Sequence, residues 1–444
     1  MRAAISAGGK GTRIGESFPN LPKPMIPILG KPLLQWQIES LVAQGICDIT
    51  LIIGYRAEQI KSHFGDGAAF GAKISYIVED EPLGTGGALA LLSKEDTLLL
   101  YGDVFCEVDF SRLMAFHNEK KANVTLFAHP NSHPHDSDII VADRDSRVTA
   151  WKSKSDRDRG DLRNLVNAGV YIFSRNALPE GPAAKLDLER DVIMPMLPSE
   201  KVFAYRSTEY VKDMGTPERL AEVENDIKSG MAASRCLNNV QRAVFLDRDG
   251  TINELRGLID SPDKIELIPR AAEAIRMLNK SPFLAICVTN QPIIARGMAN
   301  HEQLDMIHAR LDSLLGREGA YLDDLLYCPH HPDKGYPEEN PEYKIECQCR
   351  KPKPGMLLEA AERYNIDLSQ SYMIGDSTAD ILAGLSAGCT SLGVKTGEAS
   401  NDGKYADPIQ NAHCVYDTLY DAIMVVLQND SCQDDSNKAN DWRQ

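Results

Sequence analysis

The sequence has few cysteines for its length and no long hydrophobic run, and each shortage excludes a class of protein. Ten cysteines in 444 residues are too few for a disulfide scaffold, so a reducing cytoplasm is the expected location. No apolar run reaches the roughly 18 residues that span a bilayer, and the N-terminus becomes glycine-rich too early for a signal peptide. No basic block offsets the net charge of −16, which argues against nucleic acid or an anionic membrane as a partner. Small-molecule partners are expected, and a homo-oligomer is compatible with this composition.

Short β-branched runs alternate with helical stretches in two series along the chain. The length suits two or three domains, and this alternation is typical of parallel sheets covered by helices. We therefore predict an α/β protein of two Rossmann-like three-layer αβα domains with mostly parallel sheets. The expected strands are residues 3–5, 49–53, 74–78, 97–101, 243–246, 283–288 and 372–374.

The domain boundary is expected near residue 235. A helical stretch begins at Pro217 and ends near Ser234, and residues 236–239 read as a linker. The predicted domains are residues 1–235 and 236–427. Residues 428–444 are rich in Asp, Asn, Ser and Gln, which predicts a disordered tail.

A glycine-rich turn follows the first expected strand. Residues 8–13 read Gly-Gly-Lys-Gly-Thr-Arg, and closely spaced glycines let backbone N–H groups face one anion, beside the forked cation of Arg13. The pattern is neither a Walker loop nor a dinucleotide fingerprint, and by itself it fits a structural turn equally well. Further motifs add Lys23 between two prolines, a second loop at 81–87, and Asp103 at a strand end.

Together with Asp213, these motifs resemble the sugar-1-phosphate nucleotidyltransferases over roughly residues 1–230. The resemblance implies attack of a sugar phosphate on a nucleoside triphosphate with release of pyrophosphate, which needs cations and a metal more than a base. It implies that Arg13 and Lys23 hold the triphosphate and that Asp103 and Asp213 bind Mg²⁺. The implied nucleotide-binding residues are Gly8, Gly9, Gly11, Thr12, Glu81, Gly84 and Thr85.

Sugar contacts and base preference follow from the same resemblance. Asn167, Gly169 and Glu189 match positions that hold the sugar in this family. Lys154 lacks the glutamate that usually accompanies it, so it is either a sugar contact or a solvated loop lysine. Glu81 favours GTP, because a carboxylate can accept from both N–H donors on the pairing edge of guanine.

A second set of motifs begins after residues 243–246, where 247–251 read Asp-Arg-Asp-Gly-Thr. Acidic loops are common, but three supporting motifs follow in order: Val-Thr-Asn-Gln at 288–291, Arg-Lys-Pro at 350–352 and Gly-Asp-Ser-Thr-Ala-Asp at 375–380. The set resembles the haloacid dehalogenase-like phosphatases. Strand ends are where open α/β sheets bind ligands.

This second resemblance implies a role for each motif. Asp247 attacks phosphorus, while Asp249 protonates the leaving alcohol and then activates water. Mg²⁺ lies between Asp247, Asp376 and the backbone of Asp249. Asp380 either caps the following helix or joins the metal site. The residues expected at the sugar phosphate are Thr289, Asn290, Arg350 and Lys351.

A Cys-x-His pair at Cys328 and His330 and a Cys-x-Cys pair at Cys347 and Cys349 have the composition of a closed tetrahedral Zn²⁺ site. The polar segment between them has little to bury, so a metal would give it a reason to order. Free buried cysteines are the alternative, and His331 could replace His330. The pair ends directly before Arg350, so it is expected to hold the cations at 350–351.

This combination resembles the D-glycero-D-manno-heptose 1,7-bisphosphate 7-phosphatases, with histidinol phosphatases as near relatives. Residues 292–293 are Pro-Ile where the family usually has Ser-Gly, and the absence of a long cap insertion suits a small sugar phosphate. The fusion predicts removal of the 7-phosphate and transfer of GMP from GTP to D-glycero-α-D-manno-heptose 1-phosphate, giving GDP-heptose for surface glycans such as lipopolysaccharide. The alternatives are a histidinol-phosphate-type phosphatase fused to a transferase for another sugar, and an N-terminal nucleotide-sugar sensor that regulates the phosphatase.

Overall fold

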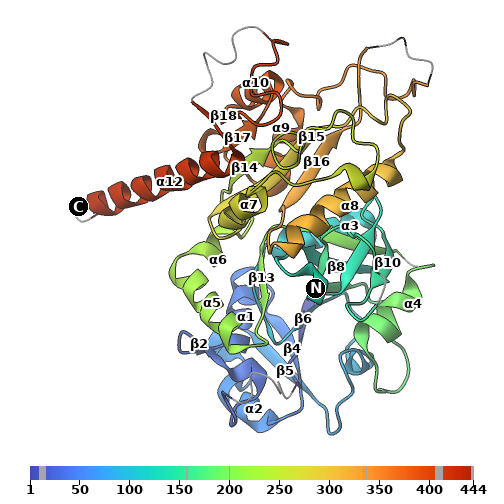
Figure 1. Ribbon diagram of the computed structural model, residues 1–444. Helices are drawn as coiled ribbons and strands as arrows, with labels where there is room; N and C mark the ends of the chain where they lie inside the picture. The colour runs from blue at the N-terminus through green and yellow to red at the C-terminus, as the bar shows by residue number, and fades with distance from the viewer. Residues whose placement is uncertain are drawn as a thin grey trace. The chain divides into compact units, whose positions relative to one another are not determined.

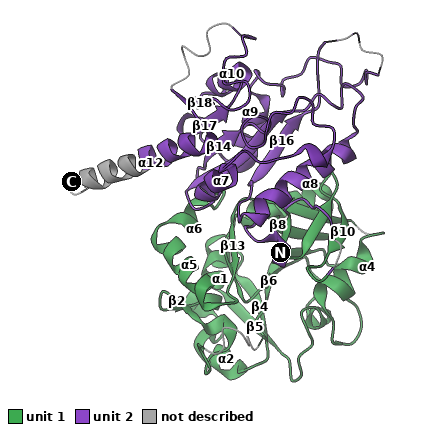
Figure 2. Ribbon diagram, in the orientation of Figure 1, with its two compact units in different colours: residues 1–129, 137–155, 165–238 green, residues 130–136, 156–164, 239–444 purple. Residues whose placement is uncertain are grey.

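A computed structural model describes residues 1–9, 17–156, 159–199, 201–333, 335, 338–405 and 414–441, with backbone alone over 431–441. The chain divides into two compact units (Figures 1 and 2). Unit 1 holds residues 1–129, 137–155 and 165–238, and unit 2 holds residues 130–136, 156–164 and 239–444. Unit 1 thus ends close to the expected boundary, but two loops from the N-terminal half belong to unit 2.

A mixed sheet forms the centre of unit 1. Its parallel half is the run β6-β1-β4-β5, and its other half adds antiparallel pairs through β11. Residues in β1 are buried on both faces, which is why these strands read as continuous apolar runs. The strands are β1 (Arg2–Ser6), β4 (Asp48–Ile53), β5 (Lys73–Val78), β6 (Thr97–Tyr101), β8 (Val124–His129), β9 (Ile139–Ala142), β10 (Val148–Lys152), β11 (Val166–Phe173) and β12 (Val202–Arg206).

Different elements cover the two faces of this sheet. Helices α1 (Leu33–Ala43), α2 (Ala57–Phe64) and α3 (Phe110–Lys120) bury their apolar sides against one face. Short helical segments η4 (Gly87–Leu91) and η6 (Leu188–Ile193) pack on the other. The remaining elements of unit 1 are β2 (Pro27–Ile28), β3 (Lys31–Pro32), β7 (Val104–Glu107), β13 (Tyr210–Asp213), η2 (Lys23–Met25), η3 (Ala68–Phe70), α4 (Met194–Met196), α5 (Pro217–Lys228) and α6 (Met231–Ser234).

Unit 2 is a parallel sheet between two helical layers, in the strand order β16-β15-β14-β17-β18-β19 (Figure 1). Helices α7, α8 and α12 share one hydrophobic core with alternate residues of the strands. Helix α9 instead contacts β16, and helix α10 contacts β17 and β18. The three-layer αβα prediction is confirmed. The elements are β14 (Arg242–Leu246), β15 (Phe283–Asn290), β16 (Asp324–Cys328), β17 (Tyr372–Gly375), β18 (Thr390–Val394), β19 (Cys414–Tyr416), α7 (Ala271–Asn279), α8 (His301–Arg317), α9 (Gly355–Tyr364), α10 (Thr378–Ala387), α12 (Leu419–Asp441), η5 (Pro134–Asp136), η7 (Pro262–Lys264) and η8 (Leu368–Gln370).

The expected start of the tail at residue 428 lies inside α12. Asp430 on this helix forms an ion pair with Arg242 on β14, so the chain packs on unit 2 beyond residue 428. The apolar residues Leu419, Ile423 and Val426, which lie on one face of the helix, explain why it stays on the sheet. No helix in the described ranges is long and apolar enough to cross a membrane.

Candidate active sites

The phosphatase motifs meet at the carboxyl edge of the unit 2 sheet. Strand β14 lies between β15 and β17, so residues that follow these three strands are neighbours. Asp247 follows β14 and its backbone N–H donates to Ile374 O at 3.0 Å. Thr289 and Asn290 end β15, and Asp376 follows β17. The order of the strands in the sheet therefore brings these motifs to one edge, as the sequence led us to expect.

Three carboxylates form a cluster there. Oxygens of Asp247, Asp376 and Asp380 lie within 4.8 Å of one another. Lys351 Nζ lies 2.6 Å from Asp247 Oδ1 and 2.6 Å from Asp380 Oδ1. Burial, followed by the neighbouring carboxylates, raises the pKa of Asp247 to about 7 and that of Asp376 to about 8. One lysine does not balance three acids, and the deficit of positive charge fits a divalent cation with oxygen ligands.

Asp380 caps helix α10 and also lies in the carboxylate cluster, so its position suits both roles that the sequence left open. Its Oδ2 accepts from the backbone N–H of Ser377 at 3.0 Å and from the Ser377 hydroxyl at 2.6 Å, which caps helix α10. Its Oδ1 faces Lys351 and the carboxylate cluster. Capping therefore fixes the orientation of a side chain that also belongs to the candidate metal site.

Two glycines enclose the carboxylate of Asp376. Gly250 has φ +84°, and a Cβ there would lie 2.2 Å from Asp376 Oδ2. Gly397 has φ +61°, and its Cβ would lie 2.0 Å from the same oxygen. The N–H of Glu398 donates to this oxygen at 2.7 Å. Sequence reasoning missed the loop at 396–398, whose only signal was a glycine after an apolar strand.

The phosphoryl-binding candidates are linked by hydrogen bonds. Asn290 Nδ2 donates to Lys351 O at 3.0 Å, and Lys351 N donates to Asn290 Oδ1 at 3.0 Å. Lys351 Nζ also donates to Val288 O at 2.7 Å. Gln291 Nε2 donates to Thr289 Oγ1 at 2.9 Å, which leaves the threonine proton to point at an acceptor. Such an acceptor would be a phosphoryl oxygen.

The carboxylate of Asp249 is turned toward other partners. Arg248, Asn253 and Gln291 donate to it. Burial alone raises the pKa of Asp249, but the charge and hydrogen bonds of Arg248 and the two amides outweigh it and leave that pKa below its ordinary value. Any metal contact from Asp249 would therefore come from its backbone, as the sequence predicted.

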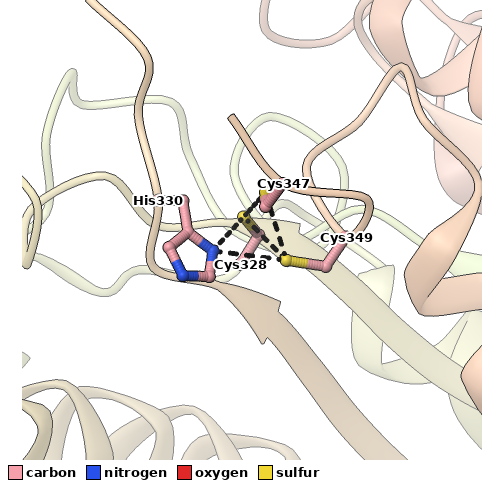
Figure 3. Close-up of side chains that lie close together, drawn as sticks. All are labelled: Cys328, His330, Cys347 and Cys349. Carbon is pink, nitrogen blue, oxygen red and sulfur yellow. Dashed lines mark hydrogen bonds between the residues drawn. The ribbon is translucent and has the colours of Figure 1, made fainter. Parts of the chain in front are cut away.

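The four expected zinc ligands converge (Figure 3). Cys349 Sγ lies 3.2 Å from Cys328 Sγ, 3.4 Å from Cys347 Sγ and 3.4 Å from His330 Nδ1. Cys328 Sγ lies 3.6 Å from His330 Nδ1 and 3.5 Å from Cys347 Sγ. A tetrahedron with Zn–S bonds of about 2.3 Å has edges of roughly 3.7 Å, so this donor set fits Zn²⁺.

Further contacts support this ligand set. The hydrogen bond between Cys328 and Cys349 lowers the pKa of Cys349 and raises that of Cys328, so within this pair the thiolate form is favoured at Cys349. His331 Nδ1 instead accepts from Asp333 N at 3.2 Å, so His330 is the clustered imidazole. Arg350 Nη1 donates to His330 O at 3.1 Å. The cluster is thus bonded directly to one of the cations that follow it.

In unit 1, residues 10–16 lie outside the described residues, and with them the predicted contacts of Gly11, Thr12 and Arg13. The structure instead places Glu79 at the glycine turn: a Cβ on Gly8 would lie 2.5 Å from Glu79 Oε2. Glu79 Oε1 accepts from Leu83 N at 3.3 Å, and burial raises the pKa of this carboxyl group. Glu81, Gly84 and Thr85 are exposed on the same loop. Glu79 is therefore a carboxylate that sequence reasoning missed, although it ends a predicted strand.

The two expected metal-binding aspartates of unit 1 lie side by side. Strand β13 pairs with β7, and Met214 N donates to Asp103 O at 2.8 Å, which brings Asp213 next to Asp103. Lys23 Nζ lies 2.5 Å from Asp103 Oδ2. Arg219 pairs with Asp213 and was not predicted. Two neighbouring carboxylates, each beside a cationic side chain, suit the binding of a triphosphate together with its metal ion.

A half-buried hydrogen-bond network around Glu189 marks the expected sugar position. Glu189 Oε1 accepts from Tyr101 OH at 2.7 Å, from Tyr171 OH at 2.6 Å and from Asn167 Nδ2 at 3.3 Å. Gly169 has φ +74°, and a Cβ there would lie 2.9 Å from the Tyr101 ring. Sequence reasoning missed Tyr171. Lys154 is exposed, and its N–H donates to Asp138 Oδ1 at 2.8 Å.

Comparisons with known proteins agree with this division. The family profile Nucleotidyl transferase matches residues 2–230, and the profile HAD-hydrolase-like matches residues 348–422. The mannose-1-phosphate guanylyltransferase of Mycobacterium tuberculosis is 34% identical, over 56% of this chain and 70% of its own length. The D-glycero-β-D-manno-heptose-1,7-bisphosphate 7-phosphatase of Pasteurella multocida is 42% identical, over 37% of this chain and 88% of its own length.

Among solved structures, HddC from Yersinia pseudotuberculosis matches 51% of this chain and 99% of its own, with 27% identity and a TM-score of 0.44. The profile and sequence matches assign a different kind of enzyme to each half of the chain. The chain belongs to the nucleotidyltransferase family in its N-terminal half and to the heptose-bisphosphate 7-phosphatase family in its C-terminal half, and it is a bifunctional enzyme.

Proposed function

We propose that this enzyme removes the 7-phosphate of D-glycero-D-manno-heptose 1,7-bisphosphate and then transfers GMP from GTP to D-glycero-α-D-manno-heptose 1-phosphate. The products are phosphate, pyrophosphate and GDP-heptose. The fusion itself carries the proposal: the first half-reaction leaves a sugar 1-phosphate, and a sugar 1-phosphate is what the other half consumes. Relatives of the two halves are named for heptose bisphosphate and for guanylyl transfer.

In the phosphatase half, Asp247 attacks phosphorus while Lys351 and Thr289 hold the phosphoryl oxygens. Asp249 gives its proton to the leaving alcohol and later takes one from water. Asn290 and Arg350 orient the lysine and the sugar phosphate. A Mg²⁺ ion held by Asp247, Asp376 and the backbone of Asp249 would neutralise the approach of two anions. Zn²⁺ on the Cys328 cluster has a structural role, because the protein fills all four positions.

In the transferase half, Arg13 and Lys23 hold the triphosphate, and Asp103 and Asp213 would hold Mg²⁺. The glycines at 8, 9 and 11 offer their backbone N–H groups. Asn167 and Glu189 bind sugar hydroxyls, the latter oriented by two tyrosines. Glu81 motivates the choice of GTP, and Glu79 offers a second carboxylate on the same loop.

The test supplies the full-length protein with Mg²⁺, either anomer of heptose 1,7-bisphosphate, and one of GTP, ATP, CTP, UTP or dTTP. We expect phosphate release from the bisphosphate, followed by pyrophosphate release with GTP. Both anomers are included because the phosphatase relatives are named for the β anomer. Phosphate without pyrophosphate would reject the transferase assignment, and equal use of UTP would reject guanine selection. Faster hydrolysis of histidinol phosphate would reject the heptose substrate.

A further inference from the structure

A buried arginine separates the two aspartates of the phosphatase motif. Arg248 is 0% exposed. Its Nε donates to Asp249 Oδ1 at 3.0 Å, and its Nη2 donates to Asp249 Oδ2 at 2.8 Å. A guanidinium that meets both carboxylate oxygens fixes the plane of the carboxylate as well as its position.

Two amides complete the environment of Asp249. Asn253 Nδ2 donates to Oδ1 at 2.9 Å, and Gln291 Nε2 donates to Oδ2 at 2.8 Å. The same Gln291 nitrogen donates to Thr289 Oγ1. The orientation of Asp249 is therefore linked, through one amide, to a side chain that is proposed to hold the phosphoryl group.

This arrangement is costly for the fold. Among the described residues, Arg248 Nη1 is buried without a hydrogen-bond partner, an omission that costs about 1–3 kcal/mol. Burial, followed by the charge of Arg248, lowers the pKa of the fully buried His308 well below its ordinary value, so this imidazole adds no second positive charge. Replacing a buried ion pair by apolar side chains of similar volume often leaves the stability of a fold unchanged or raises it. The cost points to a role in the reaction.

We infer that Arg248 is a positioning residue for proton transfer: it holds Asp249 in the orientation from which Asp249 serves the leaving alcohol. The inference rests on the proposed role of Asp249. As the P–O bond breaks, the proton of Asp249 passes to the departing oxygen, and in the second step water returns a proton to Asp249. Each Asp249 oxygen accepts two N–H donors, so the oxygen that takes the proton keeps one lone pair for Arg248 and releases the amide, Asn253 or Gln291, that also donates to it.

The test compares two substrates of the full-length enzyme with Mg²⁺: a sugar phosphate, whose alcohol leaves poorly, and p-nitrophenyl phosphate, whose phenol leaves without a proton donor. Arg248→Met should lower kcat for the sugar phosphate by about 100-fold, the scale of general-acid catalysis. The loss on the aryl phosphate should be much smaller, and KM should change little. Arg248→Lys, which keeps the positive charge, should lower kcat for the sugar phosphate less than Arg248→Met does. Arg256→Met, an exposed arginine of the same segment, is the matched control.

The ratio of the two rates does not depend on the folded fraction, so a poorly folding variant still gives an answer. In an Asp249→Asn background, Arg248→Met should cause no further loss on the sugar phosphate, because coupled residues are not additive. Equal losses on both substrates, or additive losses in the double variant, would overturn the positioning role. If Asp249→Asn alone shows no dependence on the leaving group, the proposed function of Asp249 fails instead.

Discussion

At the scale of single residues, the space around Asp376 makes glycine necessary at position 250. A Cβ at this position would lie 2.2 Å from Asp376 Oδ2. Gly250→Ala should therefore displace a candidate metal ligand and lower phosphatase kcat by about 100-fold, the loss expected when a reacting group moves by 1 Å. Phosphate release from the bisphosphate measures the effect.

Gly257→Ala is the control for Gly250→Ala. Gly257 also has positive φ, at +66°, but nothing lies within 4 Å of its Cβ position. Both variants bear the conformational cost of about 1 kcal/mol for an L-residue in this region. Loss of activity in both variants would assign the effect to backbone strain and contradict the proposed clash. Transferase activity should be unchanged in both.

The predicted site residues that lie next to strand ends are the ones that the structure brings together. Asp247, Thr289 and Asp376 each follow an apolar run, and parallel pairing brings such ends together without further information. Glu79 also ends a strand, but no local pattern says that its carboxylate folds back on Gly8. Tyr171 was missed because a tyrosine inside a buried strand looks like core.

At the scale of elements, the cluster of Cys328, His330, Cys347 and Cys349 connects β16 to the loop that carries Arg350 and Lys351. Cys349→Ser should remove the bound zinc and lower phosphatase kcat by about 100-fold, because the cations lose their support and shift. Metal content, measured on the purified protein by mass spectrometry, should fall by one zinc per chain. Pyrophosphate release by unit 1 should continue.

Cys414→Ser provides the matched control for the cluster. Cys414 is an exposed cysteine on β19 of the same unit and lies outside the group of four. It should retain zinc and activity. A Cys349→Ser enzyme that loses zinc but keeps full phosphatase activity would show that the cluster does not support Arg350 and Lys351.

Two loops show what element-level prediction could not provide. Residues 130–136 and 156–164 belong by sequence to the first domain, yet they pack within unit 2. Arg163 Nε donates to Asp312 Oδ2 on α8 at 2.8 Å, and Asn164 N donates to the same oxygen at 3.1 Å. Such pairings join residues about 150 positions apart, and neither hydrophobic periodicity nor turn chemistry carries information over that distance.

At the scale of the whole molecule, the candidate residues of the two sites are divided between the two units. Asp103 and Asp213 belong to unit 1, while Asp247, Asp376 and the cluster of Cys328, His330, Cys347 and Cys349 belong to unit 2. Asp103→Asn should abolish pyrophosphate release and leave phosphatase activity intact. Asp247→Asn should do the reverse. A sensor in place of a transferase would show no pyrophosphate release even in the unmodified protein.

The two single variants also test how the intermediate travels. Between Gly250 and α7, the described chain forms no helix or strand other than the short segment η7, so no cap domain is inserted at this point of the chain. The heptose 1-phosphate should therefore leave into solvent before it is used. An equimolar mixture of Asp103→Asn and Asp247→Asn enzymes, given heptose 1,7-bisphosphate and GTP, should then form GDP-heptose as fast as the unmodified enzyme at the same concentration of active sites. Both time courses should show the same lag while the intermediate accumulates. A mixture that lags behind the unmodified enzyme, although each variant keeps its own activity, would mean that the intermediate passes within one chain.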